Sequence, residues 1–150
     1  MIAFLLLLLS MIAALISEIK TYEDNIHPYI WVAGGIAGLV CNVLGFGIVS
    51  WIEGVIAAII LLIILILLYS KICAIIGGGV LKGFLVMGIV LGRYSLLALV
   101  NFIVVSVIAI LIEKGLSYWK GQFYYGAIFL LITTLLTWGE YFLIVSQLSV

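Results

Sequence analysis

Residues 77–83, Gly-Gly-Gly-Val-Leu-Lys-Gly, are the part of this chain best suited to chemistry. They interrupt long apolar segments, and three successive glycines weaken a helix because glycine loses the most conformational freedom on ordering. In a membrane, non-helical backbone is tolerated only where protein or water covers it. Glycines also let a second backbone approach closely. We therefore predict a loop at 77–83 and expect it to shape a binding or catalytic site.

Two other polar segments supply groups that could act with this loop. The ionisable side chains of residues 18–27 and 113–122 that could contribute are Glu18, Glu23, Asp24, His27, Glu113, Lys114 and Lys120. We expect His27 to be an ordinary loop residue near a membrane surface rather than a proton relay. Cys41 and Cys73 lie in or beside apolar runs and form neither a zinc site nor a disulfide framework. We expect no metal and no other cofactor.

Composition places these polar segments in a membrane protein. Of 150 residues, 68% are hydrophobic and 8% are charged, whereas a soluble domain has about 45–50% apolar and about 25% charged residues. The formal net charge is zero, so there is no basic face for nucleic acid. The sequence therefore predicts an integral membrane protein, with the lipid bilayer as its main surroundings and no nucleic-acid partner.

The charges and glycines divide the chain into six apolar helices. We expect helices at about 2–17, 28–43, 51–70, 81–91, 95–112 and 123–145. The first is read as a retained helix rather than a secretory signal, because no Lys or Arg precedes it and no convincing cleavage site follows. Residues 92–94, Gly-Arg-Tyr, interrupt the chain after the fourth helix. That helix crosses a membrane only if it begins within the glycine loop, since a span needs about 20 residues.

The distribution of positive charge favours six crossings over five. With six, all five lysines fall on one side and only Arg93 on the other; the lysines are Lys20, Lys71, Lys82, Lys114 and Lys120. Positive residues mark the cytosolic face. We expect an all-α, six-helix polytopic bundle, a single domain of residues 1–150, with a short fourth helix and both termini non-cytosolic. Tyr and Trp near the span ends, including Trp31, Tyr94, Trp138 and Tyr141, are expected to form an interfacial belt.

Two of these segments resemble the catalytic loops of the type IV prepilin and preflagellin peptidases, which are GxGD membrane aspartyl proteases. In that family an aspartate, an aliphatic residue and a basic residue follow the first helix, and residues 18–21, Glu-Ile-Lys-Thr, fit with glutamate for aspartate. The second loop of the family is Gly-x-Gly-Asp-x-Lys before an apolar helix that ends in Leu-Gly. Residues 77–82 fit it except at Val80, and residues 91–92 are Leu-Gly. Residues 121–126 are similar to the segment that opens the family's last helix, so the resemblance covers nearly the whole chain.

The resemblance implies an endopeptidase with two carboxylates that share a proton, one activating water and the other polarising the scissile carbonyl. Glu18 would occupy the first carboxylate position and Val80 the second. The residues implied to shape the loops and contact substrate are Lys20, Gly77, Gly78, Gly79 and Lys82. The implied partner is the signal helix of a prepilin or archaellin-like precursor, cut at the cytosolic face of a prokaryotic cytoplasmic membrane.

The departures from the family pattern argue against proteolysis. Val80 cannot titrate, and Glu18 places its carboxylate one methylene further out. Loss of one member of a catalytic unit commonly costs about 10⁴–10⁶ in rate. Rescue by Glu113 remains an alternative, although the family has no counterpart there. We read the chain as a family member that has lost proteolysis, or as an inactivated form of a working protease.

Two other function classes remain open from the sequence. A small transporter or channel could use the glycine-rich interruption, since broken helices mark transport sites. A structural subunit could associate through the small residues of 33–38, Ala-Gly-Gly-Ile-Ala-Gly, although this face would equally serve packing inside the monomer. A homodimer is also left open. We expect Asn42 and Asn101 to bond across helices, and Glu53 to lie at the membrane interface.

Overall fold

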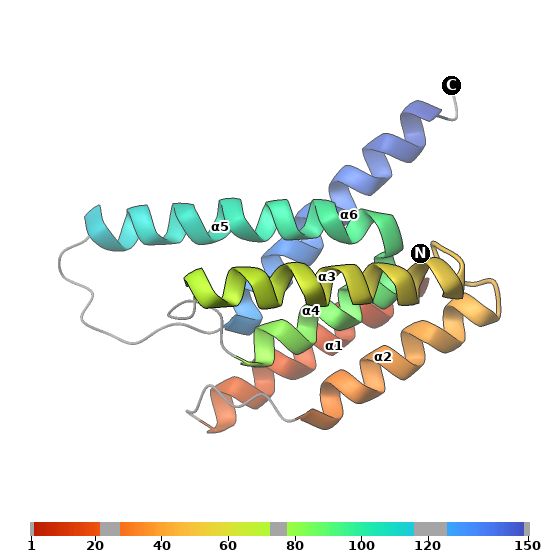
Figure 1. Cartoon of the computed structure of the whole chain (residues 1–150), viewed down its shortest axis with the longest axis horizontal. Coiled ribbons are helices and arrows are strands. Elements are labelled where there is room, and N and C mark those ends of the chain that lie inside the picture. Colours follow the sequence, from red (N-terminus) through yellow and green to blue (C-terminus); the bar gives the residue numbers. More distant parts are fainter. Residues whose placement is uncertain (1, 22–27, 73–77, 116–125, 149–150) are drawn as a thin grey trace.

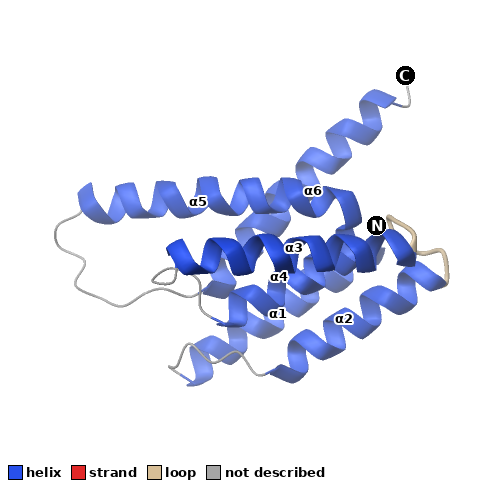
Figure 2. Ribbon diagram, in the orientation of Figure 1, coloured by secondary structure: helices blue, strands red, loops and turns tan. Residues whose placement is uncertain are grey.

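The computed structural model describes residues 2–21, 28–72, 78–115 and 126–148, and these residues form helices joined by one described loop at 44–50 (Figures 1 and 2). The elements are α1 (Ile2–Thr21), α2 (Pro28–Val43), α3 (Trp51–Ile72), α4 (Gly78–Leu91), the 3₁₀ turn η1 (Gly92–Tyr94), α5 (Ser95–Gly115) and α6 (Gly126–Leu148). No strand occurs in the described residues. The predicted all-α class is confirmed.

Successive helices run in opposite directions along the long axis of the molecule (Figure 1). The C-terminal ends of α1, α3 and α5 lie at the same end as the N-terminal ends of α2, α4 and α6. We call this the lysine end, because the lysines of the described helices fall in the helix turns at this end. They are Lys20, Lys71, Lys82 and Lys114. The opposite end, with residues 44–50 and η1, is the arginine end and carries Arg93.

Three predicted loop segments belong to helices in whole or in part; in one of them, α5 continues through residues 113–115 to Gly115. Residues 18–21 extend α1 to Thr21, since Glu and Lys are good helix formers and nothing in this segment breaks a helix. The helix expected at 81–91 begins three residues earlier, at Gly78, so the predicted loop at 77–83 is wrong for residues 78–83. A helix pairs every interior backbone N–H and C=O within itself, which in apolar surroundings outweighs the cost of glycine, about 1 kcal/mol per residue. Gly77 lies outside the described residues.

Glycines end α2 and α4 where the sequence predicted breaks. Gly45 has φ of +79° and Gly92 has φ of +53°, a conformation that side chains with a Cβ rarely adopt. Gly92 also lies close to Val49, so it has no room for a Cβ. The turn at η1 lets α5 run back antiparallel to α4 (Figure 1).

The fourth helix forms the centre of the molecule. α4 contacts α1, α2, α3, α5 and α6, and its buried apolar residues include Val80, Phe84, Met87 and Val90. The helices around it expose large apolar side chains on their outer faces, for example Ile63, Leu111 and Phe142. An apolar exterior on this scale is abnormal for a protein in water.

Two helical segments among the described residues are long and apolar enough to cross a membrane, Gly79–Ala109 and Ile128–Leu148. The first contains η1 and therefore has two antiparallel arms, α4 and α5. Three shorter apolar helical segments accompany them, Ile2–Ser17, Pro28–Val43 and Trp51–Leu67.

Candidate functional site

The lysine end brings together the helix ends that carry the sequence-predicted site. α1, α2 and α4 contact one another; Glu18 and Lys20 lie in the last turn of α1, and Gly78 and Gly79 open α4. The side chains of Glu18 and Lys20, like residue Gly77, are outside the described part of the chain. The structure therefore places the two segments at one end of the bundle, and the separation of Glu18 and residue 80 stays a prediction.

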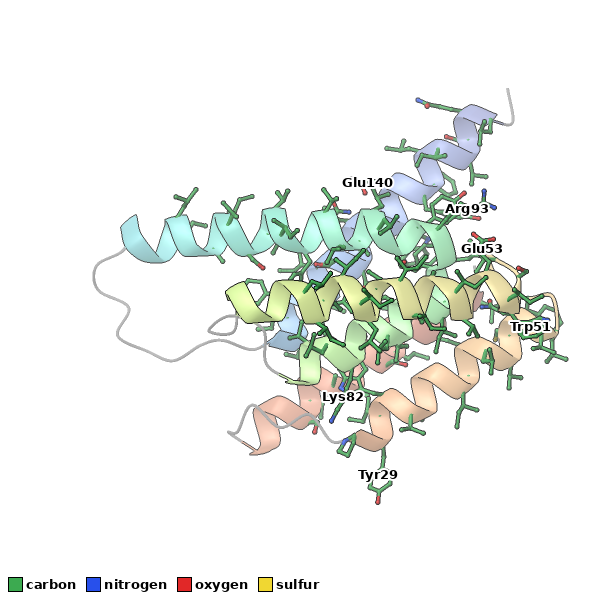
Figure 3. The ribbon with its side chains drawn as sticks, viewed as in Figure 1. Tyr29, Trp51, Glu53, Lys82, Arg93 and Glu140 are labelled. Carbon is green, nitrogen blue, oxygen red and sulfur yellow. The ribbon has the colours of Figure 1, made fainter. Side chains whose placement is uncertain are left out.

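Val80 occupies a packed apolar position. Its exposed fraction is 3%, and it belongs to the same core cluster as Met11, Trp31 and Phe84. Lys82, two residues further along α4, has an exposed side chain at the surface of the bundle (Figure 3). This fits the expected extension of Lys82 toward water or lipid headgroups. A carboxylate at position 80 would face apolar side chains, whereas valine needs no polar partner.

Glycines of α4 make room for large neighbours. A Cβ on Gly83 would lie 2.6 Å from Cδ1 of Leu130 and 3.1 Å from Cη2 of Trp31. Trp31 fills the space beside this glycine and is 4% exposed, so its prediction as an interfacial anchor is wrong. Its Nε1 has no hydrogen-bond partner among the described residues.

The arginine end holds an ion pair that the sequence did not predict. Nε of Arg93 donates to Oε1 of Glu53 at 2.9 Å, and the backbone N–H of Arg93 donates to the same oxygen at 3.3 Å (Figure 3). The Arg93 guanidinium carbon also lies 5.9 Å from the ring centre of Tyr94, within range of a cation–π contact. Glu53 in the first turn of α3 is thus paired with Arg93 in the turn that follows α4, and its expected position at a membrane interface stays a prediction. The sequence offered one signal for this pair: Glu53 and Arg93 carry opposite charges, and both were expected at the end of the bundle opposite the lysines.

A groove at the surface extends from this ion pair between α3 and α5. Its volume is about 240 Å³, and its lining residues are Glu53, Ile56, Ala57, Ile60, Gly92, Arg93, Ser95 and Leu96. The charged groups lie at one end, and the aliphatic side chains of α3 continue along one helix face. Ser95 is buried, and its hydroxyl has no partner among the described residues.

A second polar cluster joins α5 to α6. The side-chain amide of Asn101 donates to Oε2 of Glu140 at 2.7 Å and to Oγ1 of Thr137 at 3.2 Å. The hydroxyls of Thr134 and Thr137 donate to the carbonyls four residues before them. The expected bond of Asn101 across helices is confirmed. The sequence analysis missed the buried threonines, although Thr133, Thr134 and Thr137 share one side of α6.

Asn42 makes the second predicted bond across helices. Its Nδ2 donates to the backbone carbonyl of Ile89 on α4 at 2.6 Å. Gly54 permits this approach, because a Cβ there would overlap that same carbonyl oxygen. Small residues of α2 also pack inside the chain: Gly34 lies against Ser10, and Gly38 against Val90.

Some of the aromatic side chains expected in an interfacial belt are exposed, and others pack inside the chain. Tyr29 and Trp51 are 74% and 50% exposed and lie at opposite ends, as anchors should (Figure 3). Tyr94, Trp138 and Tyr141 were also expected in the belt but pack against other aromatic rings of the chain. The rings of Trp138 and Tyr141 contact Phe4, and Tyr141 also contacts Tyr94. Aromatic pairs with ring centres 4.5–7 Å apart stabilise such clusters, typically by about 0.5–1.5 kcal/mol per pair.

Within the described residues, no three His, Cys, Asp or Glu side chains come together as metal ligands. No protein-family model, no curated protein and no solved structure matches this chain.

Proposed function

We propose that this chain is a six-span membrane protein built on the scaffold of the prepilin and preflagellin peptidases, and that it binds precursor signal helices without cutting them. Its lysine end faces the cytosol and both termini lie on the other side. The packed environment of Val80 carries the proposal, because position 80 is where the resemblance places the second carboxylate. Valine has no carboxylate, so no proton can be shared between positions 18 and 80, and the proteolytic reaction loses one of its two acid–base groups.

The arrangement of the helices supports this scaffold. The resemblance requires the end of the first helix and the start of the fourth to meet on the cytosolic side. α1 and α4 contact each other, and these ends both lie at the lysine end. The lysines at this end agree with the bias of positive residues toward the cytosol.

A leader-cleavage and binding assay in membranes tests the proposal. A prepilin is coexpressed with the native chain and with a Val80→Asp, Glu18→Asp double variant. We expect the native chain to copurify with the uncut precursor, and the double variant to cleave it although it is less stable, because its new carboxylate at position 80 lies among apolar side chains. Cleavage by the native chain would contradict the proposal and direct attention to Glu113. The proposal would also be contradicted by a second outcome. In that outcome the native chain neither binds nor cuts the precursor, and the double variant is monodisperse but does not cut it.

A small transporter or channel is the second candidate, and the Asn101–Glu140 pair favours it. Ionisable residues inside spans commonly mark ion or proton pathways, and Glu140 lies in the interior of α6, half-buried. Proton flux into proteoliposomes that is abolished by Glu140→Gln would support this candidate. The small-residue face of α2 gives no support to a structural subunit, because it packs inside the chain.

A further inference from the structure

The groove between α3 and α5 combines a charged end with an aliphatic lining. One end holds both members of the Glu53–Arg93 ion pair, and the rest is lined by Ile56, Ala57, Ile60 and Leu96. Glu53 and Ile60 are seven residues apart on one face of α3, so the groove extends about 10 Å along the helix from its charged end, and its apolar part from Ile56 to Ile60 covers about 6 Å of this. Such a groove matches a molecule with a charged head and an aliphatic chain.

The ion pair leaves hydrogen-bonding groups of both signs free. Arg93 uses its Nε for Oε1 of Glu53, and its two terminal nitrogens donate to none of the described residues. Oε2 of Glu53 likewise accepts no hydrogen bond from the described residues. The side chain of Arg93 is 72% exposed, against 31% for Glu53. The free groups are therefore a guanidinium fork that suits a phosphate and a carboxylate oxygen that suits an ammonium.

The backbone fixes this arrangement. Gly92 turns the chain with a positive φ, and the N–H of Arg93 then donates to the same Glu53 oxygen as its side chain. The nearby ring of Tyr94 restricts the guanidinium further. Less ordering is needed on binding when a charged pair is already held in place.

We propose that this groove binds a phospholipid whose headgroup carries a phosphate next to a primary ammonium. The phosphate pairs with the terminal nitrogens of Arg93, and the ammonium donates to Oε2 of Glu53. One acyl chain lies along Ile56, Ala57 and Ile60. This inference rests on the membrane location of the proposed function, but not on its prepilin-peptidase scaffold.

Native mass spectrometry of the purified full chain in detergent tests the site. Phosphatidylethanolamine, phosphatidylcholine and phosphatidylglycerol with identical acyl chains are titrated separately. We expect phosphatidylethanolamine to bind about tenfold more tightly than the other two, the effect of one charged hydrogen bond. Equal binding of all three, or tightest binding of phosphatidylglycerol, would overturn the proposal.

Three variants and one control separate the contributions. Glu53→Gln keeps an acceptor for Arg93 but removes the charge, so it should abolish the preference over phosphatidylcholine. Arg93→Gln should weaken both zwitterionic lipids about tenfold, and Ala57→Phe should block the groove for all three lipids. Lys82→Gln, at the other end of the bundle, should leave the affinities for all three lipids unchanged. Unchanged lipid preference in Glu53→Gln would overturn the proposal.

Two further measurements distinguish sources of failure. Soluble phosphoethanolamine should not displace the lipid; displacement at equal concentration would show that the aliphatic groove is unused and overturn the lipid assignment. Extraction of the native chain from membranes by alkaline carbonate would refute the membrane location, and with it both proposals. A chain that resists extraction but shows no lipid preference overturns this inference alone.

Discussion

The side-chain amide of Asn101 on α5 and the carboxylate of Glu140 on α6 are joined by a hydrogen bond of 2.7 Å. The same amide also donates to Thr137, so one asparagine connects two side chains of the neighbouring helix. Hydrogen bonds between membrane helices contribute about 0.6 kcal/mol on average and about 1.7 kcal/mol at most. A charged acceptor places this bond toward the upper part of that range.

Asn101→Ala should lower the free energy of unfolding in detergent by about 1–2 kcal/mol, because it removes both bonds and leaves the carboxylate without this donor. Glu140→Gln should cost less, since a side-chain amide oxygen can still accept. A double-mutant cycle between Asn101→Ala and Glu140→Ala measures the coupling. Additive effects of the two substitutions would show that the bond contributes nothing to stability.

Three helical glycines should tolerate alanine to different degrees. Gly54→Ala places a Cβ on the backbone carbonyl of Ile89, which cannot move aside, and should destabilise by about 2–3 kcal/mol. Gly83→Ala meets the flexible end of Leu130 and should cost less. Gly139→Ala meets nothing within 4 Å and should be neutral or stabilising, by up to about 1 kcal/mol. Thermal unfolding of the three variants in one detergent gives the order; a reversed order would refute the packing of α3 on α4.

Val80→Asp alone should reduce stability by roughly 3 kcal/mol or more, because it buries a carboxylate among apolar side chains. Lys82→Gln, on the exposed side of the same helix, is the matched control and should have little effect. Urea or thermal unfolding monitored by tryptophan fluorescence measures both. A Val80→Asp variant as stable as the native chain would mean that water reaches position 80.

The proposed orientation predicts sided labelling of introduced cysteines. In a background with Cys41→Ser and Cys73→Ser, Lys82→Cys should react with a membrane-impermeant maleimide only in inverted vesicles. Phe46→Cys, which is exposed in the loop at 44–50, should react in intact cells. Labelling of both from the same side would exclude a crossing by α3, the helix between the two positions.

Most helix boundaries could be predicted from the sequence, because Pro28, Gly45 and Gly92 are local signals. Pro28 begins α2, and the two glycines end α2 and α4 with positive φ. The errors at 18–21 and 78–83 have one cause. Polarity and glycine content were taken as loop signals, whereas the pairing of backbone groups in apolar surroundings favours helix.

The candidate site was less predictable, because its contacts join residues distant in sequence. Glu53 and Arg93 are 40 residues apart, and no local pattern relates them. The burial of Trp31 depends on the space left by Gly83 on another helix, which composition does not reveal. Asn101 could be predicted to bond across helices, but its partner Glu140 could not be named.

The position of Arg93 in the turn between α4 and α5 has a consequence for biosynthesis. On the proposed orientation, this turn must pass through the bilayer while the chain is inserted, and carrying an arginine to the centre of a membrane costs about 2.5–3.5 kcal/mol. Glu53 is synthesised 40 residues earlier, so helices inserted in chain order would bring it to the far side before the hairpin of α4 and α5 enters. In that order, the Glu53 carboxylate that binds Arg93 is in place at the arginine end before Arg93 arrives. Insertion of α3 would then have to precede insertion of the α4–α5 hairpin.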